Sequence, residues 1–302
     1  MLRYRSAVLA CVLVLVPILL LGQGYVQQVG STGSVDWTNQ ILKGTGIGAP
    51  NPNQPIAAQR PGALRAAKAD ALRNLLETVK GLFLSSETTV ENAMVTSDVI
   101  RTKVEGTLRG FRTVDTRYMS DGTVEIDVEI PITGILSDAV LPQAFGGGQL
   151  LTAAQVLCPT CGQPWPAGRP LPPGVTPSTA AAMPQAAESA VFTGLVIDAR
   201  GLGVRPAMAP KVLDDKGDEI YGSKYVSREY AVDIGMVGYE KDVNRARANE
   251  RVTDNPLVVK AVQSSGPNKT DVVVAYADAQ KIHGAAANMN FLQRCKVMFI
   301  LD

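Results

Sequence analysis

The chain has 302 residues, of which 46% are hydrophobic, 19% charged and 5% aromatic, and its formal net charge is +1. This composition can build a packed core and differs from that of a globally disordered chain. The near-neutral charge excludes the basic surplus that attracts nucleic acid or anionic lipid, and the low aromatic content disfavours a carbohydrate-binding or base-stacking surface.

The N-terminus has the pattern of a secretory signal peptide. Arg3 and Arg5 precede an apolar run that only Pro17 interrupts, and the sequence GQG follows at positions 22–24. A basic start, an apolar run and a small-residue exit are typical of a cleaved signal. We therefore expect residues 1–24 to be removed. An uncleaved anchor is the alternative, although a spanning helix needs about 20 apolar residues.

Export changes the charge and the cysteine chemistry. Without residues 1–24 the chain has 27 basic and 28 acidic residues, a net charge of −1, and it meets a membrane only if that segment is retained. Cys11 precedes most of the apolar run, so we expect no lipid on it. The remaining cysteines, Cys158, Cys161 and Cys295, would lie in a compartment that permits disulfides.

Residues 25–60 are predicted to form one strand and a loop rich in Gly, Asn and Pro. The stretch GTGIGAP at positions 44–50 superficially resembles a phosphate-binding loop, but no Lys-Ser or Lys-Thr pair follows it. The strongest helix signal covers residues 62–80, where apolar side chains recur every three or four positions and Pro61 suits the helix start.

A second, shorter helix is predicted over residues 97–108, and a hairpin follows it. The hairpin strands lie at 109–119 and 123–133, because Asp121-Gly122 favours a tight turn. In the second strand, apolar residues alternate with Glu125, Asp127 and Glu129, which predicts one buried face and one acidic, solvated face. Calcium binding by these three carboxylates is a minor alternative. Residues 61–141 are thus expected to form one α+β module with helices on one face of an antiparallel sheet.

Residues 142–189 are predicted to be a linker rich in Gly, Pro and Ala, and residues 190–302 a second, strand-rich α+β domain. In the second domain the pattern predicts a hairpin around residues 215–217, a helix over 278–292 and a closing strand over 295–302.

The linker contains a pair of cysteines, Cys158 and Cys161, separated by two residues. A structural zinc site needs four ligands, and Cys158, Cys161, His283 and Cys295 would supply one such set. The prolines after Cys158 disfavour the helix that a catalytic dithiol needs. A local disulfide between Cys158 and Cys161, or a pair of reduced thiols, is the simplest interpretation. A zinc-binding or thiol-redox module is the alternative function.

The Ala-rich helix containing RAAKADALRNLLE, the segment TSDVI and the Gly-containing turn into VEIDVEIPI lie within residues 65–132. Together they resemble the LPP20 lipoprotein family, which includes the flagellar-disk lipoprotein. The resemblance extends to the N-terminal part of the flagellar assembly protein that surrounds the motor. It implies an envelope protein of a Gram-negative type bacterium and a small β-α-β-β module of a kind that often assembles side by side into rings or disks.

We therefore predict an exported, non-catalytic structural or interaction protein, located in the periplasm or at the outer membrane. The resemblance implies no catalytic residues, and the single histidine, His283, offers no partner set for a hydrolase. Its expected partners are copies of itself and other envelope proteins, with a flagellar-associated complex as one option. No cofactor is predicted unless the zinc alternative holds.

Overall fold

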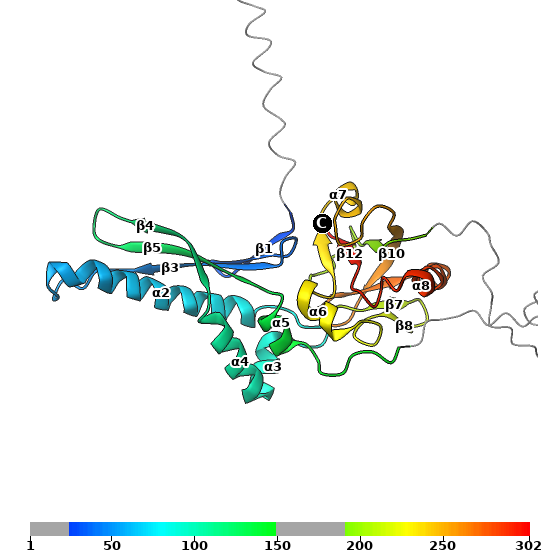
Figure 1. Ribbon diagram of the computed structural model, residues 1–302, viewed down its shortest axis with the longest axis horizontal. Helices are drawn as coiled ribbons and strands as arrows, with labels where there is room; N and C mark the ends of the chain where they lie inside the picture. The colour runs from blue at the N-terminus through cyan, green and yellow to red at the C-terminus, as the bar shows by residue number, and fades with distance from the viewer. Residues whose placement is uncertain (1–23, 149–190) are drawn as a thin grey trace, which may run out of the picture.

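The computed structural model describes residues 24–148 and 191–302, except for the side chains of residues 288 and 289. These residues form a five-stranded sheet and a seven-stranded sheet, each packed with helices (Figure 1). The predicted α+β class is confirmed, with an antiparallel sheet in the first region and a strand-rich second region.

The first sheet is antiparallel throughout and has the strand order β1-β2-β3-β5-β4. Its strands are β1 (Val26–Val29), β2 (Gly33–Asp36), β3 (Ile41–Gly48), β4 (Arg112–Tyr118) and β5 (Val124–Pro131). The helices of this region are α2 (Ile56–Lys80), α3 (Val90–Thr96), α4 (Asp98–Leu108) and α5 (Ile135–Val140). The helix α2 lies along one face of the sheet, and the β4–β5 hairpin extends away from the second region (Figure 1).

Three glycines of β3 let α2 lie close to the sheet. Gly44, Gly46 and Gly48 alternate along the strand, so all three face the helix. A Cβ atom at Gly46 would overlap the carbonyl oxygen of Ala67 and the amide nitrogen of Ala71. The stretch that superficially resembles a phosphate loop is therefore a strand whose glycines serve helix–sheet packing.

The helix predicted over residues 62–80 begins earlier in the structure. The loop predicted at the end of residues 25–60 is wrong from Ile56 onward, because α2 begins there and contains Pro61. Pro55 precedes the helix with a φ of −54°, which already suits helix entry. The expectation of a single strand in residues 25–60 is also wrong, since three short strands form there. The helix expected at 97–108 and the hairpin turn at Asp121-Gly122 are confirmed.

The second sheet is mixed, with the strand order β8-β7-β11-β10-β6-β12-β9. Its strands are β6 (Leu195–Asp198), β7 (Val212–Asp214), β8 (Glu219–Tyr221), β9 (Gly238–Glu240), β10 (Leu257–Ser265), β11 (Asp271–Val274) and β12 (Val297–Ile300). Its helices are α6 (Arg228–Ile234), α7 (Val243–Arg247) and α8 (Tyr276–Met289). Four of its strand pairs are parallel: β10 with β6, β6 with β12, β12 with β9, and β11 with β7. The predicted hairpin at 215–217, the helix and the closing strand are all present, whereas β9, α6 and α7 were not anticipated.

Loops of the first region pack directly against the second region. The amides of Met208 and Ala209 donate to the carbonyls of Phe83 and Leu84, at 2.9 and 2.8 Å. The buried Ser86 hydroxyl donates to the Asp271 carboxylate at 2.7 Å. One hydrophobic core runs through both regions, so the contact between them is a packed interface.

A second set of contacts closes this interface near the first sheet. The indole of Trp37 meets the ring of Tyr239 edge to face, with centroids 5.4 Å apart. Beside it, the Thr38 hydroxyl donates to the carbonyl of Tyr239 at 2.8 Å. On α5 and α6, Asp138 and Arg228 form an ion pair at 2.5 Å. Both short helices therefore serve the junction between the two regions.

Candidate functional sites

The structure brings none of the predicted cysteine–histidine set into a metal site among the residues it describes. Cys158 and Cys161, with most of the predicted linker, lie outside those residues. His283 is buried on α8, and its Nε2 lies 2.8 Å from the carbonyl oxygen of Ile220. Because a carbonyl only accepts, Nε2 is the protonated nitrogen. Burial lowers the pKa of His283, so the imidazole is neutral at pH 7.

Cys295 is buried and makes no disulfide. Burial raises the pKa of its thiol to about 11, so the thiolate that a metal or a redox partner needs is disfavoured. Within residues 24–148 and 191–302, no group of three or more His, Cys, Asp or Glu side chains could hold a metal ion. The zinc and thiol-redox alternatives stay predictions, because half of the proposed ligand set lies elsewhere in the chain.

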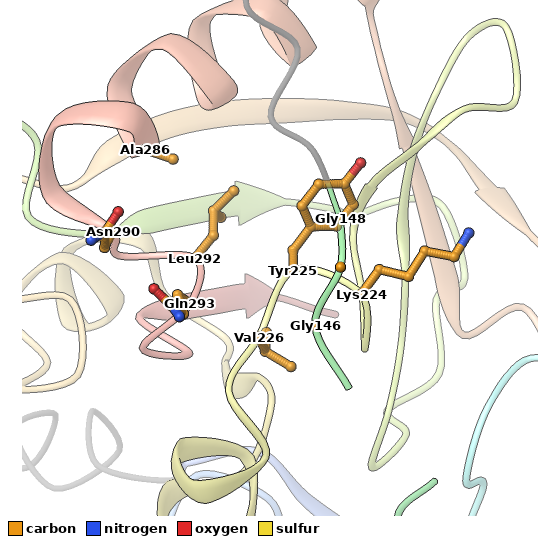
Figure 2. A pocket seen from close by; sticks show the side chains of 10 residues that line it. Gly146, Gly148, Lys224, Tyr225, Val226, Ala286, Asn290, Leu292 and Gln293 are labelled. Carbon is orange, nitrogen blue, oxygen red and sulfur yellow. The ribbon is translucent and has the colours of Figure 1, made fainter. Parts of the chain in front are cut away.

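A small hollow of 220 Å³ lies where the predicted linker begins (Figure 2). Residues after α8 line one side of it, and Lys224 and Tyr225 line the other. The amide of Gly148 donates to the Lys224 carbonyl at 2.9 Å. A Cβ at Gly148 would lie 2.9 Å from that oxygen and from the Tyr225 ring. The hollow therefore reflects the docking of a glycine segment on the second region.

The face of the first sheet opposite α2 is covered by a network of charges. Arg117 of β4 contacts Asp127 at 2.5 Å, and both Glu125 and Asp115 at 2.7 Å. These contacts raise the pKa of the Arg117 guanidinium, through Asp127 first, and Arg117 in turn lowers the pKa of Asp127. Arg112 pairs with Glu129 at the end of the same strands. The predicted solvated face is thus confirmed on β5, where buried and half-buried residues alternate.

The calcium alternative is weakened by the position of Arg117, because its guanidinium already neutralises the carboxylates that would bind the ion. Sequence reasoning named the acids and missed this arginine. The β4–β5 register is irregular between Thr113 and Asp115, so strand alternation alone did not predict which residues of β4 share the face of Glu125 and Asp127.

The open face of the sheet, defined here as Asp36, Lys43, Arg112, Asp115, Arg117, Glu125, Asp127 and Glu129, has five acidic and three basic residues. Four of these residues line a shallow hollow of 640 Å³, namely Lys43, Glu125, Asp127 and Glu129. The opposite side of the domain is the outer face of α2, where Arg65 and Lys68 are exposed and form no ion pair with any residue that the structure describes. Over its whole length α2 has five basic and two acidic residues. The two sides of this domain therefore have opposite net charges.

Each of the two regions matches a known protein family. Residues 36–131 match the family described as LPP20 lipoprotein. The suspected family is therefore confirmed over this segment, hereafter the LPP20-like domain. The match supports an exported, envelope-associated protein. Residues 194–302 match a second family, described as Treponema pallidum Tp0624, second domain. No curated protein matches the chain.

The LPP20 match covers β3, the helices α2 to α4 and the β4–β5 hairpin, which are the elements that build both charged faces. The second match covers all seven strands of the second sheet. Among the described residues, no helix is long and apolar enough to cross a membrane. Residues 1–23 of the predicted signal segment, which include Cys11, lie outside those residues.

Proposed function

We propose that this chain is a non-catalytic structural protein of the cell envelope that associates with copies of itself through the LPP20-like domain. The observation that supports this most is the opposite charge of the two sides of that domain. The open face of the sheet has a net charge of −2, and α2 on the other side has a net charge of +3.

Such a domain can stack front to back, with the open sheet face of one copy against α2 of the next. This contact is heterologous, because two different surfaces meet, and it forms rings or lines rather than a closed pair. Opposite charges steer and orient the contact. On α2, Arg73 and Lys80 are already paired with Asp70 and Glu77 within the helix. The guanidinium of Arg60 lies over the Tyr118 ring, 5.0 Å from its centroid. Arg65 and Lys68 have neither kind of contact in the described residues, so their charges are available to a neighbouring copy.

A non-catalytic role is also supported by the state of the single histidine. His283 is buried, and its Nε2 is bonded to a backbone carbonyl. A general base needs a reachable substrate, and this ring faces the interior of the second region.

The test is light scattering on the purified protein after size-exclusion chromatography. We expect a mass several times that of one chain at low ionic strength, where one chain with residues 1–24 included has 32.0 kDa. At high salt the mass should fall toward that of one chain, because salt screens contacts between exposed charges. A single species of monomer mass at every salt and protein concentration would overturn self-association.

The envelope location is tested separately by fractionation of expressing cells. We expect the protein in the osmotic-shock fluid or with the outer membrane, and a mainly cytosolic protein would contradict the proposal. A flagellar association stays a prediction, because neither family description names a flagellum.

A further inference from the structure

The second region contains a positively charged hollow of 480 Å³ beside its junction with the LPP20-like domain. Three basic residues line it, namely Arg251, Arg294 and Lys296, together with one acid, Glu250. None of the four forms an ion pair with another residue in the part of the chain that the structure describes. The size is within the range of small-molecule sites, which is about 300–1,000 Å³.

Arg251 is half-buried and holds the hollow together through backbone groups. Its guanidinium donates to the carbonyls of Gly235 at 2.9 Å and Cys295 at 3.0 Å, and to that of Ile234. Burial lowers the pKa of Arg251, whereas carboxylate partners raise the pKa of Arg117. Arg251 is therefore held by three backbone carbonyls and forms no ion pair with a carboxylate of the described residues.

The backbone conformation at Cys295 lets its two neighbours, Arg294 and Lys296, line the same hollow as Arg251. Cys295 has a φ of 54°, in the left-handed region that residues other than glycine adopt infrequently. Its own side chain is buried, while Arg294 and Lys296 on either side both line the hollow. The Arg251 bond to the Cys295 carbonyl supports this turn. Strained backbone of this kind persists where the surrounding structure requires it, and such positions are enriched at functional sites.

We propose that this hollow binds a small oxyanionic ligand, carrying a carboxylate or a phosphate group, between Arg294, Lys296 and the edge of the Arg251 guanidinium. Guanidinium and ammonium groups bind both kinds of oxyanion through charge-assisted hydrogen bonds. Tyr230 and Ile234 of α6 form an apolar wall of the same hollow, so the ligand has room for an apolar part next to its charge.

The experiment measures binding by calorimetry and by thermal shift with two probes, inorganic phosphate and citrate, against sodium chloride of equal ionic strength. The test variant is Arg294→Gln with Lys296→Gln, which leaves Arg251 and its backbone bonds in place. The matched control is Arg247→Gln with Lys260→Gln, two exposed cations of the same region that form no ion pair with a described residue. Both variants change the net charge equally.

We expect saturable binding of at least one probe to the wild type and the control, with a rise in melting temperature that follows ligand concentration. The test variant should bind at least about tenfold more weakly, because the loss of even one of its two charge-assisted bonds predicts a change of that size. Binding of phosphate alone would assign a phosphate ligand, and binding of citrate alone a carboxylate. Absence of saturable binding for both probes, or equal affinity of the test variant and the control, would overturn the proposal.

Discussion

Glycine at position 46 is a requirement of the contact between α2 and β3. A Cβ there would overlap backbone atoms of the helix, which cannot move aside as a flexible side chain can. We expect Gly46→Ala to lower the free energy of unfolding by about 3 kcal/mol, as overpacking of a core does.

Gly106→Ala is the control for this substitution. Gly106 lies inside α4, and nothing lies within 4 Å of an added Cβ. This substitution should raise the free energy of unfolding by about 0.5–1 kcal/mol, because alanine favours the helix. Urea denaturation followed by circular dichroism measures both, and equal effects of the two would contradict the packing explanation.

The buried Cys295 thiol should make the folded protein less stable at alkaline pH. Its pKa is raised to about 11 in the folded protein, above the value of about 8.5 in an unfolded chain. The folded state therefore keeps its proton longer, and the resulting stability is complete below about pH 8.5 and is lost as pH rises toward 11.

Between pH 8.5 and 10.5 we expect the free energy of unfolding to fall in both proteins. The fall should be about 2 kcal/mol larger in the wild type than in Cys295→Ala. Urea titrations of both proteins at several pH values measure the difference. Parallel pH profiles would show that the thiol is not shielded in the way that the structure indicates.

Some residue roles could be predicted from the sequence and others could not. The alternation of acids along β5 predicted its solvated face, because strand periodicity places side chains without any knowledge of the partner strand. The role of Arg117 could not be predicted, because it depends on the irregular β4–β5 register. The proximity of Arg251 and Arg294 could not be predicted either, because the fold brings together two segments that are distant in the sequence. Such tertiary neighbours leave no periodic signal in a single sequence.

At the scale of elements, α2 shows why the helix start was predicted too late. Pro61 indicated a helix beginning, yet the chain is helical from Ile56. A proline six positions into a helix lacks the amide that would bond to the Ala57 carbonyl, and this loss is tolerated near an exposed end. Packing of the buried alanines against β3 outweighs the local preference.

Pro61→Ala should therefore stabilise the protein by about 1 kcal/mol, since it restores one helix hydrogen bond. The control is Pro52→Ala in the exposed turn before the helix, where loss of a rigid residue should slightly lower stability. Circular dichroism during thermal unfolding compares the two. A destabilising Pro61→Ala would mean that the first turns of α2 are not helical in solution.

For the whole molecule, the packed junction predicts that the two sheets unfold together. Ser86 and Asp271 are both buried there, and their hydrogen bond joins the two regions. Ser86→Ala leaves one Asp271 oxygen without this donor, which should cost about 1–3 kcal/mol.

The neighbouring Ser85→Ala is the control, because the Ser85 hydroxyl accepts only a local bond from the Glu87 amide. Calorimetry should show one transition for the wild type, shifted to lower temperature as a unit in Ser86→Ala and little changed in Ser85→Ala. Two separate transitions in the wild type would contradict a shared core.

The central claim is that opposite charges on the two sides of the LPP20-like domain join neighbouring copies. Its most direct measurement is light scattering of two charge-reversed proteins, alone and mixed. One carries Arg65→Glu and Lys68→Glu on α2, and the other carries Glu125→Lys and Glu129→Lys on the open sheet face. We predict that each alone has a lower mass than the wild type and that their mixture recovers mixed assemblies, because the reversed faces complement each other. Wild-type mass in both variants, or no gain in mass on mixing, would contradict the claim.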